Sequence, residues 1–242
     1  MTILAFDTAT PATAVALTLD DGTMSTRRHD PAAGERPGHQ SLLLALVVEL
    51  LDEAGLGFTA LDRIAVGIGP GTFTGLRIGV ATARGLARAH EIELVGVSTL
   101  QALALQAAEA SPDHPRSLIL PVLDARRGEA FAAAWSAADA HDPSAPPILE
   151  PAALKPDALV AAVQSLSTPP LAAGDGALRF REQLEAAGAV VPAEGSPLHR
   201  VDAVAHCRLG AAAKPTARED VLPSYLRLPD AELTLRQRGR SE

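Results

Sequence analysis

Apolar and polar positions along the chain follow two different periods, which predicts an alternation of strands and helices. Residues 2–6, 13–19 and 64–68 are apolar runs too short for a helix, and the second of them alternates with polar residues, so each is expected to be a strand. Residues 39–54 and 73–89 repeat apolar side chains every three or four residues, as helices do. The pattern therefore predicts an α/β protein.

The stretch between the strand at residues 64–68 and the following helix is rich in glycine. Gly69, Pro70 and Gly71 predict a tight turn, and Thr72 or Thr74 is placed to cap the helix. Such a turn presents free N–H groups that suit an anion, but no Lys-Ser or Lys-Thr follows, so it is not a Walker A loop. A tight turn that allows a close helix contact is the other interpretation.

A carboxylate stands at the end of the first predicted strand and is followed by small hydroxyl residues. Such a group can bind a metal–phosphate group, or it can cap its own turn. Both interpretations stay open at this point. The candidate anion or nucleotide turn comprises Asp7, Thr8, Gly69, Gly71, Thr72 and Gly75.

The helix predicted at residues 39–54 is more apolar than a helix that covers only its own sheet needs to be. Leu43, Val47 and Leu50 form one stripe, and Leu44, Val48 and Leu51 form a neighbouring one. The second stripe predicts either burial between two layers or contact with a partner chain. His39, at the start of the helix, is interpreted as a capping or interface residue and not as a catalyst.

The second half of the chain repeats the order strand, Asp, tight turn, strand. LAFD–TATPA–TAVALTL near the N-terminus corresponds to PVLD–ARRG–EAFAAAW at residues 121–135. This pseudo-repeat predicts two related α/β units. The predicted domains are residues 1–112 and 113–232, followed by a disordered basic tail at 233–242; no function is assigned to residues 136–170.

Composition excludes several classes of function. The chain has 242 residues, a formal charge of −8 and few aromatic side chains, which disfavours a stand-alone nucleic-acid-binding protein. Cys207 is the only cysteine, so an internal disulfide and a cysteine-based zinc site are excluded. The N-terminus has no signal-peptide pattern, and no apolar run reaches membrane length, so a soluble, cytoplasmic protein is expected. No GxSxG, HExxH or HxxxH motif is present, so no catalytic centre and no metal site are assigned.

Several short motifs occur together in an order that resembles one protein family. They are Asp7-Thr8-Ala9-Thr10, the stretch GIGPGTFTGLRIGVATARGLA, VSTL at residues 97–100, Asp124-Ala125-Arg126-x-Gly128-Glu129, and Tyr225-Leu226-Arg227. This order resembles the TsaB (YeaZ) family, over nearly the whole chain. The resemblance implies the actin-like, RNase H-like ATPase fold, in which two related lobes have mixed sheets flanked by helices.

The resemblance also implies a function. TsaB proteins are non-catalytic dimerisation partners of TsaD, which transfers a threonylcarbamoyl group to the adenosine beside the anticodon of tRNA and so forms N6-threonylcarbamoyladenosine (t6A). TsaD carries a metal-binding HxxxH motif that this chain lacks. The resemblance implies that the ATPase TsaE joins the complex and that this chain contacts tRNA only indirectly, through the complex. It leaves open whether the chain forms a homodimer when it is alone. The resemblance assigns no cofactor to this chain and leaves ATP or ADP binding to the complex.

In the family, the contact with TsaD is a bundle of the first two helices of the N-terminal lobe. These correspond here to residues 39–54 and 73–89. The predicted partner interface consists of His39, Leu43, Leu44, Val47, Val48, Leu51, Arg77, Gly79, Val80 and Ala83. The alternative function is a free-standing actin-like ATPase or a glycopeptidase-like hydrolase.

Overall fold

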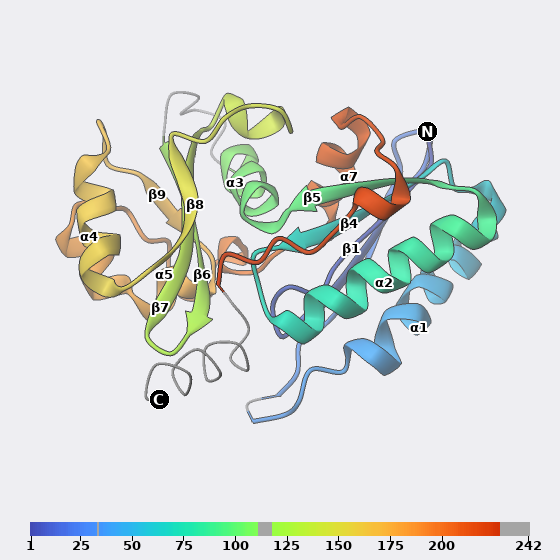
Figure 1. Ribbon diagram of the computed structural model, residues 1–242, viewed down its shortest axis with the longest axis horizontal. Helices are drawn as coiled ribbons and strands as arrows, with labels where there is room; N and C mark the ends of the chain where they lie inside the picture. Colours follow the sequence, from blue (N-terminus) through green and yellow to red (C-terminus); the bar gives the residue numbers. More distant parts are fainter. Residues whose placement is uncertain (33, 111–117, 228–242) are drawn as a thin grey trace, which may run out of the picture.

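Two mixed β-sheets lie side by side, with helices on their faces (Figure 1). The computed structural model describes residues 1–32, 34–110 and 118–227. The strands of the first sheet, in the order β3-β2-β1-β4-β5 across it, are β1 (Ile3–Asp7), β2 (Thr13–Thr18), β3 (Met24–His29), β4 (Arg63–Gly69) and β5 (Glu93–Ser98). The strands of the second, in the order β8-β7-β6-β9, are β6 (Leu118–Arg126), β7 (Glu129–Ser136), β8 (Leu149–Leu154) and β9 (Leu171–Ala173).

The two sheets share one topology. β1 pairs antiparallel with β2 and parallel with β4, and β6 pairs antiparallel with β7 and parallel with β9. The same turn chemistry recurs after the first strand of each sheet: Asp7 accepts a hydrogen bond from the N–H of Ala9 at 2.8 Å, and Asp124 accepts one from Arg126 at 2.8 Å. The predicted pair of related α/β units is therefore confirmed at the level of strand order and turn geometry.

Three groups of helices cover the sheets. One face of the first sheet carries α1 on β2 and β3, and α2 on β4 and β5, whereas α7 packs on its other face against β1 and β2. Helix α3 lies between the two sheets, and α4, α5 and α6 cover the second (Figure 1). The α-helices are α1 (His39–Glu53), α2 (Phe73–His90), α3 (Thr99–Glu109), α4 (Pro156–Ser165), α5 (Asp175–Arg179), α6 (Arg181–Ala186) and α7 (Ala203–Ala212).

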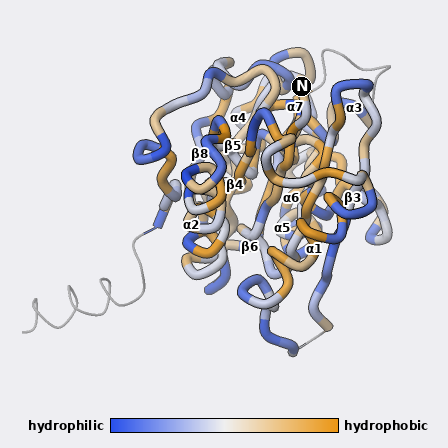
Figure 2. Tube along the Cα trace, turned by 90° about the vertical axis from the view of Figure 1, so that its right-hand side faces the viewer, coloured by the Kyte–Doolittle hydropathy of each residue, from blue (hydrophilic) through white to orange (hydrophobic). Residues whose placement is uncertain are grey.

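One apolar core joins the two sheets. Ile3 of β1, Leu103 of α3, Phe131 of β7 and Leu209 of α7 all belong to it. Figure 2 shows hydrophobic positions gathered in the interior of the molecule, where the strands lie. Because α7 follows the second sheet in sequence but packs on the first, the chain crosses between the units again after residue 200. The predicted boundary at 112/113 and the predicted tail at 233–242 lie outside the described residues, so the domain division stays a prediction.

Three local features depart from what the local sequence favours. The stretch at residues 139–151 contains a short 3-10 helix and runs into the edge strand β8, whose sequence LEPAAL lacks β-branched residues. The helical segment at residues 175–186 is interrupted at Phe180, where φ is −107°. Thr72 occupies the N-cap position of α2, but its side chain makes no capping hydrogen bond.

Candidate functional site

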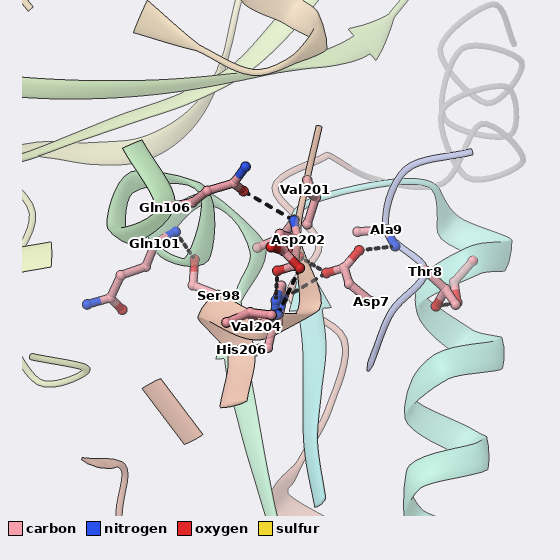
Figure 3. Close-up of polar contacts among 12 residues, drawn as sticks. Asp7, Thr8, Ala9, Ser98, Gln101, Gln106, Val201, Asp202, Val204 and His206 are labelled. Carbon is pink, nitrogen blue, oxygen red and sulfur yellow. Dashed lines mark hydrogen bonds and ion pairs between the residues drawn. The ribbon is translucent and has the colours of Figure 1, made fainter. Parts of the chain in front are cut away.

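The predicted carboxylate at the end of β1 is buried inside the molecule. Asp7 is 1% exposed, and its Oδ1 accepts the hydrogen bond from Ala9. Its Oδ2 accepts a hydrogen bond of 2.7 Å from the hydroxyl of Thr99, at the start of α3, and lies 3.0 Å from Nε2 of His206 on α7 (Figure 3). Asp7 therefore joins β1, α3 and α7, three elements that are far apart in the sequence.

The partner of Asp7 is a histidine whose two ring nitrogens both face oxygen atoms. Nδ1 of His206 lies 3.0 Å from the carbonyl oxygen of Asp202, while Nε2 faces Asp7. A neutral imidazole has one N–H, so both contacts are satisfied together only if the Asp7–His206 pair holds one additional proton. Burial by itself raises the pKa of Asp7, but the hydrogen bonds and charge of His206, together with those from Thr99 and Ala9, bring that pKa below its ordinary value. Asp7 is therefore held as an ionised carboxylate against the ring of His206.

The glycines between β4 and α2 allow the turn after β1 to approach closely. A side chain at Gly71 would overlap the carbonyl oxygen of Ala9, and one at Gly75 would overlap that of Thr8. The hydroxyl of Thr8 donates a 2.7 Å hydrogen bond to the carbonyl of Gly75, and the N–H of Thr72 donates one of 2.7 Å to Ala9. These glycines serve the close packing of two turns against each other.

This geometry supports the close-packing interpretation of the two turns, and the candidate anion site stays a prediction. The two turns meet, and Asp7 and Thr8 are buried. The sequence reasoning left this alternative open and could not decide it, because His206 is about 200 residues away and no motif marks it. Nucleotide binding by this chain stays a prediction. The residues concerned are Asp7, Thr8, Gly69, Gly71, Thr72 and Gly75.

The outer side of α1 carries apolar residues that the described part of the chain leaves exposed. Leu44 is 47% exposed and Val48 is 42% exposed, one helical turn apart, while Leu43 and Val47 face the core of the first sheet. His39 is also buried, and its Nδ1 lies 2.8 Å from the hydroxyl of Thr13. Of the two apolar stripes predicted on this helix, only the one through Leu44 and Val48 reaches the surface.

The residues predicted on α2 divide in the same way. Gly79, Val80 and Ala83 face the sheet, and a side chain at Gly79 would overlap the hydroxyl of Thr8. Arg77 is exposed. Leu51 on α1 is buried as well. Most members of the predicted interface therefore belong to the chain's own core, and the interface itself stays a prediction that now depends on Leu44, Val48 and Arg77.

The second lobe holds a group of charged residues that the sequence reasoning did not single out as a site. Nη1 of Arg179 donates a 2.8 Å hydrogen bond to the carboxylate of Asp124, and the N–H of Asp124 donates one of 3.0 Å to Asp175. Burial raises the pKa of Asp175 above its ordinary value. Asp175 also lines a cavity of about 350 Å³ between the lobes, which Arg28 and His199 border too. The repeat of Asp7 at Asp124 is the signal that pointed to this position.

Two kinds of site were searched for in the part of the chain that the structure describes. Within residues 1–32, 34–110 and 118–227, no three His, Cys, Asp or Glu side chains come together in a way that could hold a metal ion. No helix of that part is both long enough and apolar enough to cross a membrane.

Comparisons with known proteins agree on one family. A family model described as TsaD, tRNA N6-adenosine threonylcarbamoyltransferase, matches residues 33–168. The tRNA threonylcarbamoyladenosine biosynthesis protein TsaB of Escherichia coli K12 is 40% identical over 131 residues, which cover 54% of this chain and 53% of that protein. TsaB of Bacillus subtilis 168 is 34% identical over 131 residues, again 54% of this chain and 53% of that protein. The chain thus spans about half the length of the curated relatives it matches.

A solved structure extends the likeness to both lobes. YeaZ from Pseudomonas aeruginosa superposes with a TM-score of 0.75 at 30% identity, and the match covers 93% of this chain and 99% of that one. Together with the mixed sheets and flanking helices, this match shows the actin-like, RNase H-like ATPase fold. The chain belongs to the TsaB (YeaZ) family.

Proposed function

We propose that this chain is the non-catalytic scaffold subunit of a complex that forms N6-threonylcarbamoyladenosine (t6A) in tRNA. In this proposal the chain binds TsaD, which performs the transfer, and TsaE joins them. The names of its relatives support the pathway, since E. coli and B. subtilis TsaB are described as tRNA threonylcarbamoyladenosine biosynthesis proteins. The family model that matches residues 33–168 carries the name of the transferase itself.

The observation that carries the scaffold role is the exposed apolar pair on α1. Leu44 and Val48 lie on a helix that already buries Leu43, Val47 and Leu50 in its own sheet, so the outer pair is not needed for the fold. Large apolar side chains that lie next to each other on a surface are typical of a protein–protein contact. A helix of TsaD packed along α1 would cover them.

The environments of the two candidate reactive side chains, Cys207 and Asp7, also favour a scaffold over a hydrolase. Burial raises the pKa of the Cys207 thiol to about 12, so it is a poor nucleophile at neutral pH. Asp7, which a nucleotide-hydrolysing alternative requires, is closed off by His206 and Thr99. Both observations support an accessory role.

The first test is a binding experiment on α1. The double variant Leu44→Glu/Val48→Glu should fold normally, because both side chains are exposed, and should lose co-elution with TsaD, because the contact would bury charge without a partner. Ile148→Glu is the matched control: Ile148 is 54% exposed on the other lobe and should keep TsaD bound. Leu43→Glu or Val47→Glu would not be informative, since either would disrupt the core. Undiminished co-elution of the double variant would refute the interface.

The second test is a reconstituted modification reaction. It contains tRNA, TsaD, TsaE and a supply of threonylcarbamoyl-adenylate, with or without this chain. We expect t6A only when the chain is present, and none from the chain without TsaD. Full modification in its absence would remove the scaffold role. Calorimetry with ATP, on the wild type and on Asp7→Ala, would then examine the ATPase alternative.

A further inference from the structure

A groove lined by arginines runs along the side of α2 that faces away from α1. Arg77, Arg84 and Arg88 recur on this side at helical spacing, and Arg218 approaches from the opposite wall. Two cavities follow one another in the groove and share Arg84. One, of about 590 Å³, is lined by Arg77, Arg84 and Tyr225, and the other, of about 580 Å³, is lined by Arg84, Arg88 and Arg218.

These arginines are the unusual feature of an otherwise acidic protein. The formal charge of the chain is −8. Most arginines of the described chain pair with a carboxylate, whereas none of the ion pairs found within the described residues involves the four arginines of the groove. Glu91 and Glu219 line the end near Arg88, so the positive charge is strongest around Arg77 and Arg84.

The groove has a fixed wall and an aromatic end. The N–H of Ser224 donates a 2.7 Å hydrogen bond to the carbonyl of Ile68, which holds the C-terminal segment against β4. Tyr225 is 40% exposed, its ring centroid lies 5.0 Å from that of Phe73, and its hydroxyl accepts a 3.1 Å hydrogen bond from Arg77. Arg77 in turn lies 3.7 Å from the Phe73 ring centroid. An exposed aromatic face next to positioned guanidinium groups suits a nucleobase beside its phosphate.

From these features we infer that the groove binds the phosphate backbone of RNA. Arg88 lies eleven helical positions after Arg77, which corresponds to a row of roughly 16 Å at about 1.5 Å per residue. A row of this length meets several successive phosphates, whereas a single small anion would need the arginines to converge on one point. Guanidinium groups also match phosphate geometry in a bidentate manner.

The RNA in question is tRNA, and this identification rests on the proposed function. Leu44 and Val48 lie outside the groove, because η4 (Arg218–Asp220) packs near β5 at one edge of the sheet, whereas α1 covers β2 and β3 at the opposite edge. Arg77 belongs both to the groove and to the predicted TsaD interface, so the groove is tested at Arg84 and Arg88. One chain can therefore hold TsaD along Leu44 and Val48 of α1 and tRNA along Arg84 and Arg88 of α2. In this arrangement the scaffold contacts the substrate directly, which differs from the indirect contact implied by the resemblance.

The test measures RNA binding by the chain alone, so that it does not depend on TsaD. A fluorescently labelled tRNA transcript is titrated with wild type, with Arg84→Glu/Arg88→Glu and with Lys155→Glu, at several salt concentrations. The arginine variant should bind about tenfold or more weakly, and the slope of log affinity against log salt should fall by about two, one for each lost phosphate contact. Lys155 is exposed in the other lobe, so reversing its charge should change the affinity and the salt slope less than the arginine variant does.

Three outcomes would overturn the inference. They are the absence of tRNA binding by the folded wild-type chain, an equal loss for Lys155→Glu, and unchanged RNA binding by the arginine variant. If that variant instead loses TsaD, the groove is a protein-binding surface. Co-elution with TsaD is measured in parallel, so a failure of the RNA proposal is distinguished from a failure of the scaffold proposal.

Discussion

Asp7 and His206 form the buried hydrogen-bonded pair on which single substitutions should act most strongly. Asp7→Asn keeps the shape of the side chain but removes the negative charge that faces the His206 ring. Breaking a buried pair from one side costs about 3–5 kcal/mol, so urea unfolding at pH 7 should show a loss of that order. Asp21→Asn is the matched control, because Asp21 accepts a comparable 2.8 Å hydrogen bond from Thr23 at the exposed β2–β3 turn. Its unfolding midpoint should stay close to that of the wild type.

The same pair makes this difference depend on pH. The pKa of Asp7 is lowered in the folded state, so its contribution to the free energy of unfolding is fully present above the unfolded-state pKa of about 3.9. The contribution is lost as the pH falls through the lower folded-state pKa. The gap between wild type and Asp7→Asn should therefore be largest near neutral pH and shrink below about pH 4. A gap that is absent at pH 7, or equally large at pH 3, would contradict this account.

At the scale of single residues, the sequence identified the important positions more reliably than it predicted their roles. It identified Asp7, Gly71 and Gly75, and it left open a choice between anion binding and close packing. The buried partner of Asp7, His206, lies on a helix near the other end of the chain, and local spacing carries no information about such a contact. On α1, the helical periodicity predicted both apolar stripes but not which of them faces inward. Two neighbouring stripes have the same pattern in the sequence, and only the position of the sheet distinguishes them.

At the scale of an element, α2 depends on where its glycines lie. A side chain at Gly75 would overlap the backbone of Thr8, whereas one at Gly85 would meet nothing within 4 Å. Gly75→Ala should therefore lower the free energy of unfolding by about 1–3 kcal/mol through overpacking. Gly85→Ala should raise it by up to about 1 kcal/mol, because alanine is the better helix former. Urea unfolding of both variants under one set of conditions makes the comparison, and equal effects would show that the approach of the two turns is not tight.

Most elements were predictable because their patterns are local. β1, β2, β4, β6 and the helices α1 and α2 follow from short apolar runs, the repeated strand–Asp–turn–strand order and helical periodicity. The edge strand β8 was not found, because its residues favour no strand by themselves. Pairing with β7 supplies what the local sequence lacks.

At the scale of the whole molecule, the pseudo-repeat predicted two units, but it gave no sign of how firmly they are joined. Leu103 of α3 lies next to Gly174 of the second lobe, and the same core includes α7 on the first sheet. These contacts are between segments that are distant in sequence. We expect a core of this kind to make the two lobes unfold together, because neither lobe can expose its part of the shared core without also exposing α3.

Trp135 provides a test of this coupling, because it is the only tryptophan and lies in β7 of the second sheet. In urea, its fluorescence and the far-UV circular dichroism of the whole chain should change in one coincident transition. Leu50→Ala sharpens the test: Leu50 is buried between α1 and the first sheet, in a core cluster that does not include Trp135. The loss of about 2–5 kcal/mol expected for a buried leucine should shift the Trp135 transition as far as the dichroism. A Trp135 midpoint that does not move would mean that the lobes unfold independently, and that the shared core is too weak to join them.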